Sequence, residues 1–413
     1  MEEWKVYKIG DICSNVCSGG TPTSTHSEYY DGDIPWLNTK EICFNRIHKT
    51  ERNITEEGLN NSSAKWIPEN TVIVAMYGAT AGKTAIAKIP LTTNQACCNL
   101  TINSEIADYR FVYYYLLNKY SVICSLANGG AQQNLNAQII KDFKINLPPT
   151  LEQTRIASFL SSLDDKIEIN KRINDNLEQQ AQALFKSWFV DFEPFKDQPF
   201  EESELGMIPK GWKCSKLKEV STKITDGVHN TVKDDPNGKC LLLSCKNIKG
   251  GKITYGNDER KISEDTFNKL RKRTNISKGD ILLSSVGTLG ELVLLNEDLP
   301  NIEFQRSVAI IKPNSNILTS HFLYFSLINQ KKQIINSGHG AVQQCLFLSD
   351  IAELTTIIPP KEEMDRFTKY SISLMNKIVN LQHESRRLAQ LRDLLLPKLM
   401  SGELKINDVE KNL

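Results

Sequence analysis

The sequence INLPPTLEQTRIASFLSSLDDKIEIN, residues 145–170, begins a long periodic segment directly after a Pro-Pro pair. Alternate steps of four and three residues from Ile156 fall mostly on apolar side chains, which is the 3.5-residue period of a coiled coil. The steps reach Leu160, Leu163, Ile167, Asn170, Asn174, Leu177, Ala181, Leu184 and Trp188. A helix of about 40 residues rises about 60 Å, too long to bury its stripe against one small domain. The pattern therefore predicts a second long helix as its partner.

A second copy of this segment follows the Pro-Pro pair at 359–360, and it belongs to a repeat that spans nearly the whole chain. Its seam is Leu374, Ile378, Leu381, Ser385, Leu388, Arg392, Leu395 and Leu399. A shift of about 210 residues also matches FVYYYLLN (111–118) with FLYFSLIN (322–329), and Gln95 with Gln305. Such self-similarity indicates two homologous halves in tandem.

Each half begins with about 150 residues of short β-branched runs, such as TVIVAMY (71–77) and ILLSSV (281–286), which are typical of strands. Segments 108–126 and 320–335 have the pattern of helices. We expect a mixed α/β (α+β) fold in which two globular domains are joined by two long antiparallel coiled-coil helices with pseudo-two-fold symmetry. The expected boundaries are domain 1 at 1–150, helix 1 at 151–190, a linker at 191–208, domain 2 at 209–360, helix 2 at 361–400 and a tail at 401–413.

Two features of the first helix allow more than one interpretation. Asn170 and Asn174 either fix the register of the helix pair, as buried Asn does in coiled coils, or sit at the edge of the seam. The aromatic run LFKSWFVDFEPF (184–195) is either a cap on the core or a docking patch for a partner.

Composition places the chain among ordinary multidomain proteins. It has 413 residues, 40% hydrophobic and 24% charged. The acidic start MEEWKVYK resembles no signal peptide, and no apolar run reaches about 18 residues, so we expect a cytoplasmic protein with no membrane association. The ten cysteines form no C-x-x-C pair, which favours reduced, mostly buried thiols over a metal site.

The charge is segmented although the total is only +1. Residues 151–208 carry 6 basic and 12 acidic side chains, whereas 209–360 carry 21 basic and 15 acidic ones. Neighbouring blocks of opposite sign favour separate surfaces for separate partners, one of them anionic.

Catalytic motifs are broken or missing. GATAGKT (78–84) has three residues between Gly78 and Gly82, where a P-loop needs four, so it predicts a tight turn that leaves Lys83 as an exposed cation. LPPT (147–150) and IPPK (358–361) lack the polar and aromatic residues that flank Pro-Pro in methyltransferases acting on base amino groups. The six histidines are scattered singly. We therefore expect no catalytic residue, no metal and no cofactor on this chain.

The sequence resembles the specificity subunit of type I restriction-modification systems, and the likeness covers nearly all 413 positions. The strings that carry it are SGGTPTS (18–24), IPWLNTKEI (34–42), NQACCNL (94–100), GGAQQNLNAQII (129–140), residues 145–170, LFKSWFVDFEPF (184–195) and GMIPKGW (206–212). The second half departs from this pattern, because KCLLLSCKNI (239–248) replaces the IPW string and its Gly loop lacks the cation.

The resemblance implies two target recognition domains, each reading one half of a bipartite DNA target, and two conserved spacer helices that set the gap. The departures predict an asymmetric target. It also implies three partners: double-stranded DNA, two copies of a modification methyltransferase subunit, and a restriction motor-nuclease subunit. The methyl donor and ATP are expected on those subunits. The acidic first spacer and the aromatic run 184–195 are the docking surfaces that we expect for the methyltransferase.

Base contacts require side chains with the hydrogen-bonding chemistry of the major groove, on loops or helix ends. The candidates in the first half are Thr21, Thr23, Ser24, Asn38, Thr39, Lys40, Tyr77, Thr80, Lys83 and Asn94. Those in the second half are His229, Asn230, Lys246, Asn247, Ser285, Thr288 and Arg306. Each has the alternative of a solvated loop residue or a turn cap. Gln132-Gln133 and Gln343-Gln344 are shared by both halves, so we expect them to bind scaffold backbone.

Phosphate contacts are expected from a basic cluster in the second domain, whose alternative is a solvated charged helix at 264–273. Its members are Arg260, Lys261, Lys269, Arg271, Lys272, Arg273 and Lys278.

Two other functions compete with DNA recognition. An enzyme that hydrolyses nucleotides or transfers methyl groups would turn over ATP or a methyl donor alone, and the broken spacings argue against it. A coiled-coil scaffold with two protein-binding domains is favoured by the near-neutral total charge. Binding to randomised duplex DNA separates the scaffold from a DNA specificity subunit.

Overall fold

The computed structural model describes residues 4–127, 134–256, 258–340 and 344–410. These form two compact units. Unit 1 comprises Met1–Glu168 and Glu384–Leu413, and unit 2 comprises Ile169–His383. Each unit contains parts of both long helices, α5 (Thr150–Phe189) and α11 (Lys361–Ser401).

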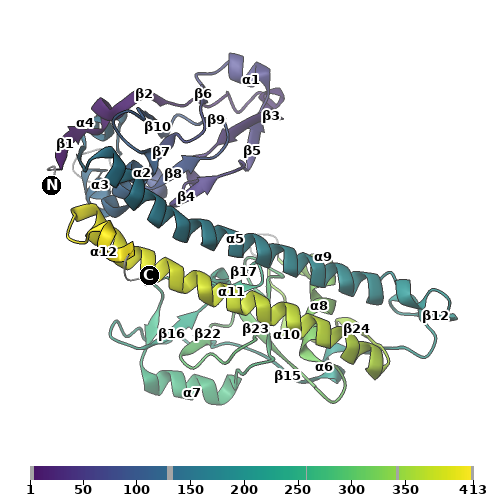
Figure 1. The fold of residues 1–413 in the computed structure, drawn as a ribbon. Coiled ribbons are helices and arrows are strands. Elements are labelled where there is room, and N and C mark those ends of the chain that lie inside the picture. Colours follow the sequence, from purple (N-terminus) through teal and green to yellow (C-terminus); the bar gives the residue numbers. More distant parts are fainter. Residues whose placement is uncertain (1–3, 128–133, 257, 341–343, 411–413) are drawn as a thin grey trace. The chain divides into compact units, whose positions relative to one another are not determined.

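The described residues of unit 1 form three sheets. Figure 1 shows most of their strands above the first part of α5. Strand β1 (Lys5–Lys8) pairs with β11 (Lys144–Leu147) beside the start of α5. The five-stranded sheet has the order β2 (Cys13–Ser18), β10 (Cys97–Ile102), β7 (Val72–Ala75), β8 (Thr84–Ala87) and β4 (Asn45–Ile47). The four-stranded sheet has the order β5 (Arg52–Ile54), β3 (Tyr30–Leu37), β9 (Leu91–Thr93) and β6 (Trp66–Ile67).

Unit 2 repeats this topology. Strand β14 (Lys213–Lys216) pairs with β24 (Thr355–Ile358). A four-stranded sheet has the order β15 (Ser221–Asp226), β23 (Val308–Pro313), β20 (Ile281–Ser284) and β21 (Leu292–Leu294). A three-stranded sheet has the order β19 (Lys261–Ile262), β16 (Cys240–Leu243) and β22 (Ile302–Phe304). Two further hairpins are β17 (Ile248–Lys249) with β18 (Lys252–Ile253), and β12 (Phe200–Ser203) with β13 (Gly206–Pro209).

The order β2-β10-β7-β8 in unit 1 therefore equals β15-β23-β20-β21 in unit 2, and β5-β3-β9 equals β19-β16-β22. The one parallel pair of the smaller sheet recurs as well, since β3 runs parallel to β9 and β16 runs parallel to β22. Among the described strands, only β4 and β6 of unit 1 lack a counterpart in these sheets of unit 2. This shared topology confirms the predicted fold class, a mixed α/β protein with two tandem domains joined by long helices.

Short helices alternate with the strands along the chain in both units. In unit 1 they are α1 (Glu56–Asn60), α2 (Tyr109–Asn118), α3 (Tyr120–Ala127) and α4 (Ala137–Asp142), with α12 (Ile406–Glu410) near the C-terminus. In unit 2 they are α6 (Leu217–Val220), α7 (Glu264–Thr274), α8 (Ser320–Asn329), α9 (Lys331–Asn336) and α10 (Leu348–Ala352). The equivalent helices α2 and α8 are buried along most of their length, and each adjoins the long helices through a shared hydrophobic cluster.

The two long helices run in opposite directions where they meet. In unit 1, Asp164 of α5 binds Arg392 of α11 at 2.6 Å, and Lys166 of α5 lies 3.8 Å from Glu384 of α11. Residue numbers therefore rise along α5 in the direction in which they fall along α11. In unit 2, Phe185 and Phe189 of α5 each stack edge-on against Phe367 near the start of α11. The antiparallel pairing of residues that the seams predicted is therefore present within unit 1.

The aromatic run 184–195 is core. Phe185, Phe189 and Phe195 are buried, and Trp188 is 9% exposed. They belong to one cluster with Trp212, Phe322 and Phe367, which arrive from distant parts of the sequence. The expectation that this run is an exposed docking patch is wrong, because residues far along the chain cover it.

Asn170 and Asn174 are also buried, at 0% and 3% exposure, so neither lies at an exposed edge of the seam. The side-chain oxygen of Asn174 finds no hydrogen-bond partner among the described residues. An unsatisfied buried amide costs stability, and a role for these residues in helix register stays a prediction.

All ten cysteines are free thiols. Only Cys97, Cys98 and Cys240 are fully buried, whereas six others are half-buried and Cys43 is exposed. The thiols are thus less buried than the sequence led us to expect. Burial raises the pKa of Cys98 to about 12, which keeps that thiol protonated and unreactive.

Candidate nucleic-acid interface

The candidate site in unit 1 is a sheet edge at which four strands meet. Ser18 at the end of β2 lies opposite Cys98, and Ala75 at the end of β7 lies opposite Cys97, so β2 and β7 end together where β10 begins. Strands β3 and β9 run parallel and also end side by side, at Leu37 and Thr93. The turn from β9 to β10 joins the two sheets. We call the loops at this edge, residues 19–26, 38–44, 76–83 and 94–96, the first loop edge.

Unit 2 has the same edge. Asp226 at the end of β15 lies opposite Ala309, and Ser284 at the end of β20 lies opposite Val308. The parallel strands β16 and β22 end together at Leu243 and Phe304. We call residues 227–232, 244–247, 285–290 and 305–307 the second loop edge. Loops on a rigid sheet are the usual location of binding residues.

One glycine in each unit fixes the first of these loops against the turn between the sheets. A Cβ atom on Gly19 would lie 2.0 Å from the carbonyl oxygen of Thr93, and one on Gly227 would lie 2.0 Å from that of Phe304. No side chain fits at such a distance, so both positions require glycine. The loops that follow, with Thr21 in one unit and His229 in the other, are therefore held beside the turns after β9 and β22.

Most of the predicted residues of unit 1 reach the surface of the first loop edge. Thr21, Thr23, Ser24, Lys40 and Tyr77 are exposed, and Asn38, Thr39, Thr80 and Lys83 are half-buried. The short helix η3 (Thr39–Glu41) packs beside η4 (Gly78–Thr80), so the second and third loops meet.

The side chains of two predicted residues form hydrogen bonds within the fold. Asn94 is only 8% exposed, and its Oδ1 accepts from the Ala96 backbone and the Cys97 thiol. Asn38 caps η3 through its bond from the Lys40 backbone N–H. We therefore no longer count Asn94 as a base contact, and Asn38 fits the alternative of a turn cap.

The predicted residues of unit 2 divide in the same way. His229, Asn230, Lys246, Thr288 and Arg306 are exposed on the second loop edge. Ser285 is buried, and so is Asn247.

Asn247 is wholly engaged inside the fold. It accepts from the Ser244 backbone N–H and donates to the Thr254 carbonyl and to Glu259. Burial and this bonding leave it no group for a base, so it is withdrawn from the base contacts together with Ser285.

Arg271 of the basic cluster is an internal anchor. Its guanidinium donates to the fully buried Glu303 and to the carbonyls of Ile276, Leu299 and Ile302. Burial raises the pKa of Glu303, and Arg271 acts against that rise. Four of its five N–H donors are bound inside the protein, so the expectation of a phosphate contact at Arg271 is not supported.

The other members of the cluster differ in how much charge they present. Arg260 pairs with Asp234, and Arg273 lies 3.7 Å from Asp226 and donates to its carbonyl. Lys261 is half-buried. Lys269, Lys272 and Lys278 are exposed, and no carboxylate within the described part of the chain pairs with them.

Equivalent hydrogen bonds show that one residue of the edge was missed. In unit 1 the Asn94 N–H donates to the Leu37 carbonyl, and the Asn94 carbonyl accepts from the Cys97 N–H. In unit 2 the Gln305 N–H donates to the Leu243 carbonyl, and the Gln305 carbonyl accepts from the Val308 N–H. Asn94 therefore matches Gln305, and the exposed Gln95 matches the exposed Arg306. The alignment of Gln95 with Gln305 in the sequence is therefore wrong by one residue. Because it paired two glutamines, Gln95 was counted among the residues shared by both halves and not among the base contacts.

The expected backbone contacts of the paired glutamines are only partly visible. Gln132, Gln133 and Gln343 lie outside the described residues. At Gln344 the main-chain carbonyl accepts from the Gly287 N–H, and its side chain is exposed.

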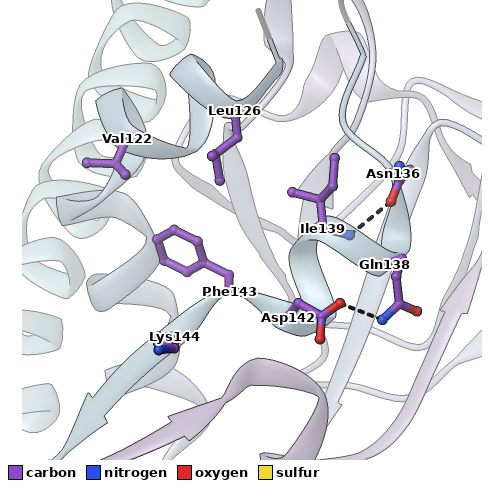
Figure 2. A pocket seen from close by; sticks show the side chains of 8 residues that line it. All are labelled: Val122, Leu126, Asn136, Gln138, Ile139, Asp142, Phe143 and Lys144. Carbon is purple, nitrogen blue, oxygen red and sulfur yellow. Dashed lines mark hydrogen bonds between the residues drawn. The ribbon is translucent and has the colours of Figure 1, made fainter. Parts of the chain in front are cut away.

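A hollow on unit 1 lies between α3 and α4, behind the loop 76–83, whose Met76 and Ala81 carbonyls are bound by Leu135 and Cys124. It has a volume of about 520 Å³, and Figure 2 shows Phe143 and Ile139 forming its apolar part. The carboxylate of Asp142 is bound by Lys8 and Gln138, and the Asn136 side chain accepts from the Ile139 N–H (Figure 2). Its lining residues offer no nucleophile paired with a base. No cluster of three or more metal-ligating side chains occurs within the described ranges.

Comparisons with known proteins agree with this geometry. The model of the "Type I restriction modification DNA specificity domain" matches residues 1–179 and 209–385, which is once per half. The MjaIX specificity subunit of a type I restriction enzyme from Methanocaldococcus jannaschii is 32% identical, over 99% of this chain and 95% of its own length. The HindI specificity subunit from Haemophilus influenzae is 24% identical over 98% of this chain.

A solved structure shares the fold. The type I restriction-modification S subunit from M. genitalium superposes with a TM-score of 0.55 at 20% identity, and the match covers 96% of both chains.

Proposed function

The chain belongs to the family of type I restriction-modification DNA specificity subunits, and we propose that each loop edge binds one half of an asymmetric, bipartite duplex target. The observation that carries this proposal is the recurrence of one edge in both units with different exposed side chains. The first edge carries an aromatic residue, Tyr77, and a cation, Lys83, whereas the corresponding loop of the second edge, residues 285–290, contains neither an aromatic residue nor a cation. A shared scaffold with different surface chemistry suits two different half-sites.

The surviving base-reading candidates are side chains that are exposed or half-buried. On the first edge these are Thr21, Thr23, Ser24, Thr39, Lys40, Tyr77, Thr80 and Lys83, and the structure adds Gln95. On the second edge they are His229, Asn230, Lys246, Thr288 and Arg306. Amides, hydroxyls and cations of this kind recognise base edges in the major groove.

Phosphate contacts are proposed at Lys269, Lys272 and Lys278, which present unpaired positive charge near α7. Arg273 contributes more weakly, because Asp226 partly neutralises it. Such contacts strengthen binding to every sequence and make it sensitive to salt.

The spacer helices α5 and α11 are proposed to fix the distance between the half-sites, because a helix of about 40 residues is a ruler of about 60 Å. Methylation and cleavage belong to partner subunits: two copies of a methyltransferase and a motor nuclease, which bind the methyl donor and ATP. The acidic segment 151–208 remains the proposed docking surface for the methyltransferase, now without the aromatic run.

The scaffold alternative is disfavoured by the match of both halves to a DNA specificity family. No helix within the described residues is long and apolar enough to cross a membrane.

The test is selection of bound duplexes from a random pool by the full chain reconstituted with its methyltransferase. We expect one enriched motif that consists of two half-sites of different sequence separated by a spacer of constant length. A pool that stays random, or two identical words at varying distances, would contradict the proposal.

A further inference from the structure

The turn that links the two sheets of each unit projects one side chain at the centre of its loop edge. In unit 1 this turn runs from Asn94 to Ala96, and in unit 2 from Gln305 to Ser307. The backbone of each turn is bonded on both sides. Met76 N–H donates to Ala96 and Ser285 N–H donates to Ser307, while the turn's first N–H donates to Leu37 or Leu243. The exposed tips, Gln95 and Arg306, therefore stand on a rigid base.

Arg306 is anchored further by the first loop of its edge. Its N–H donates to the Val228 carbonyl at 3.0 Å, and the Val228 N–H donates to Phe304 at 2.9 Å. The tip thus lies directly beside His229 and Asn230. In unit 1 the hydroxyl of Thr21, from the equivalent loop, donates to the side-chain oxygen of Gln95. Both tips adjoin the loop that follows an obligatory glycine.

The charge of Arg306 is not compensated by the fold. Neighbouring cations are paired, since Lys246 lies 3.0 Å from Glu259, and Arg273 lies 3.7 Å from Asp226. Arg306 has no carboxylate within 4 Å in the described part of the chain. An exposed guanidinium on a rigid turn, with its donors unused, is a preformed fork for a pair of acceptors.

The two tips match two different bases. A guanidinium bonds both acceptors of guanine, O6 and N7, whereas an amide accepts from adenine N6 and donates to N7. The bond from Thr21 orients the Gln95 amide, and its NH₂ group remains available as the donor.

We propose that Gln95 and Arg306 are equivalent specificity-determining residues, with Gln95 reading an adenine in one half-site and Arg306 reading a guanine in the other. This inference rests on the proposed function, since it assigns one position of each half-site to one residue. It also explains why two units with one scaffold address different words.

The experiment repeats the duplex selection with R306Q and with Q95R. In R306Q, preference for guanine at one position of one half-site falls by about 5- to 150-fold and shifts toward adenine. In Q95R the reverse change occurs in the other half-site. Replacing that guanine by 7-deazaguanine, which lacks the N7 acceptor, weakens the wild type and leaves R306Q unaffected.

The matched control is K278Q, which removes the same charge from an exposed lysine outside the loop edge. It weakens all sequences alike. If R306Q behaves like K278Q, Arg306 is a phosphate contact and the inference is wrong. If both tip variants leave every position of the motif unchanged, the inference is wrong as well. Failure of the wild type to select any bipartite motif would instead defeat the proposed function. Equal urea midpoints for all variants show that folding is unaffected.

Discussion

At one position of the repeat, the domain of unit 1 contacts the long helices through charged and polar side chains, whereas the domain of unit 2 contacts them through apolar ones. In unit 1 the hydroxyl of Tyr114 donates to Asp164 at 2.5 Å, and Arg392 donates to the same carboxylate at 2.6 Å. The shift of 211 residues that aligns the Pro-Pro pairs places Phe325 and Met375 at the positions of Tyr114 and Asp164. By the same shift, Ala181 of unit 2 matches Arg392.

The comparison shows that one backbone arrangement accepts either an ion pair or an aromatic core. In unit 2, Phe185 lies within 6.3 Å, ring centre to ring centre, of Phe189, Phe322, Phe325 and Phe367. Its counterpart in unit 1 is Leu396, in a cluster with fewer aromatic rings. Buried ion pairs contribute little net stability but cost much when one partner is lost. The contact between the domain and the long helices therefore depends on an ion pair in unit 1 and on the packing of apolar side chains in unit 2.

The largest expected effect is at the centre of the aromatic cluster. F185A removes a ring that is 3% exposed and has four aromatic neighbours. We expect it to lower the free energy of unfolding of unit 2 by about 3–5 kcal/mol. Urea titration followed by tryptophan fluorescence measures this loss. The matched variant L396A should cost less and act on unit 1, and equal losses in both would remove the contrast.

The next effect breaks the ion pair of unit 1. R392A leaves Asp164 with a side-chain exposure of 13% and without its cation, and we expect a loss of about 3 kcal/mol. The triple variant Y114F/D164M/R392A copies the chemistry of unit 2. It should recover most of that loss in the same urea titration. A triple variant less stable than R392A would show that the apolar solution does not transfer between units.

Alkaline pH should lower the free energy of unfolding more in unit 1 than in unit 2, by a smaller amount than the variants above. Burial, and then the neighbouring charge and bond of Asp164, hold the pKa of Tyr114 well above its usual value. The unfolded state therefore releases this proton first, and stability is present below about pH 10 and lost as the pH rises further. Tyr113 and Tyr324 occupy equivalent positions, so they act on both units alike. Tyr114, Tyr115 and Tyr120 of unit 1 have raised pKa values and no tyrosine at the equivalent position of unit 2.

Y114F should reduce the alkaline loss in unit 1 by about one kcal/mol per pH unit above 10. Urea midpoints between pH 8 and pH 11 measure it. An unchanged slope in Y114F would show that the phenol does not titrate differently in the folded state.

The smallest expected effect concerns phosphate binding in unit 2. K272E should weaken binding to all duplexes alike and lower the slope of log K against log salt by about one. R273E should do less, because Asp226 already pairs with that side chain. Fluorescence anisotropy with two unrelated duplexes across a salt series tests this. Weakening confined to one duplex would assign Lys272 to base reading.

The sequence was sufficient for the features that repeat with a period. The 3.5-residue seam predicted helices at 151–190 and 361–400, and the structure has α5 at Thr150–Phe189 and α11 at Lys361–Ser401. The duplication was likewise visible because equivalent strands retain their β-branched residues and bounding turns. These signals are local or periodic, so they need no knowledge of tertiary contacts.

The engagement of individual polar side chains was not predictable. Arg271 and Asn247 have the composition of binding residues, but Glu303 and Glu259 reach them from 32 and 12 residues away. The aromatic run 184–195 was equally ambiguous, because Phe322 and Phe367 cover it from the far half of the unit. Gln95 was missed because the sequence alignment paired it with Gln305 by residue type, one position before its structural match, Arg306.

The most direct test of two edges on two half-sites is site-specific photo-crosslinking on the selected duplex. A photoreactive phenylalanine analogue replaces Tyr77 on the first edge, Thr288 on the second, or Leu151 on α5, which is 74% exposed and serves as the control. We expect position 77 to crosslink only within one half-site and position 288 only within the other, and this expectation can fail in two ways. Crosslinks from both positions to the same half-site, or yields no higher than those from position 151, would contradict it.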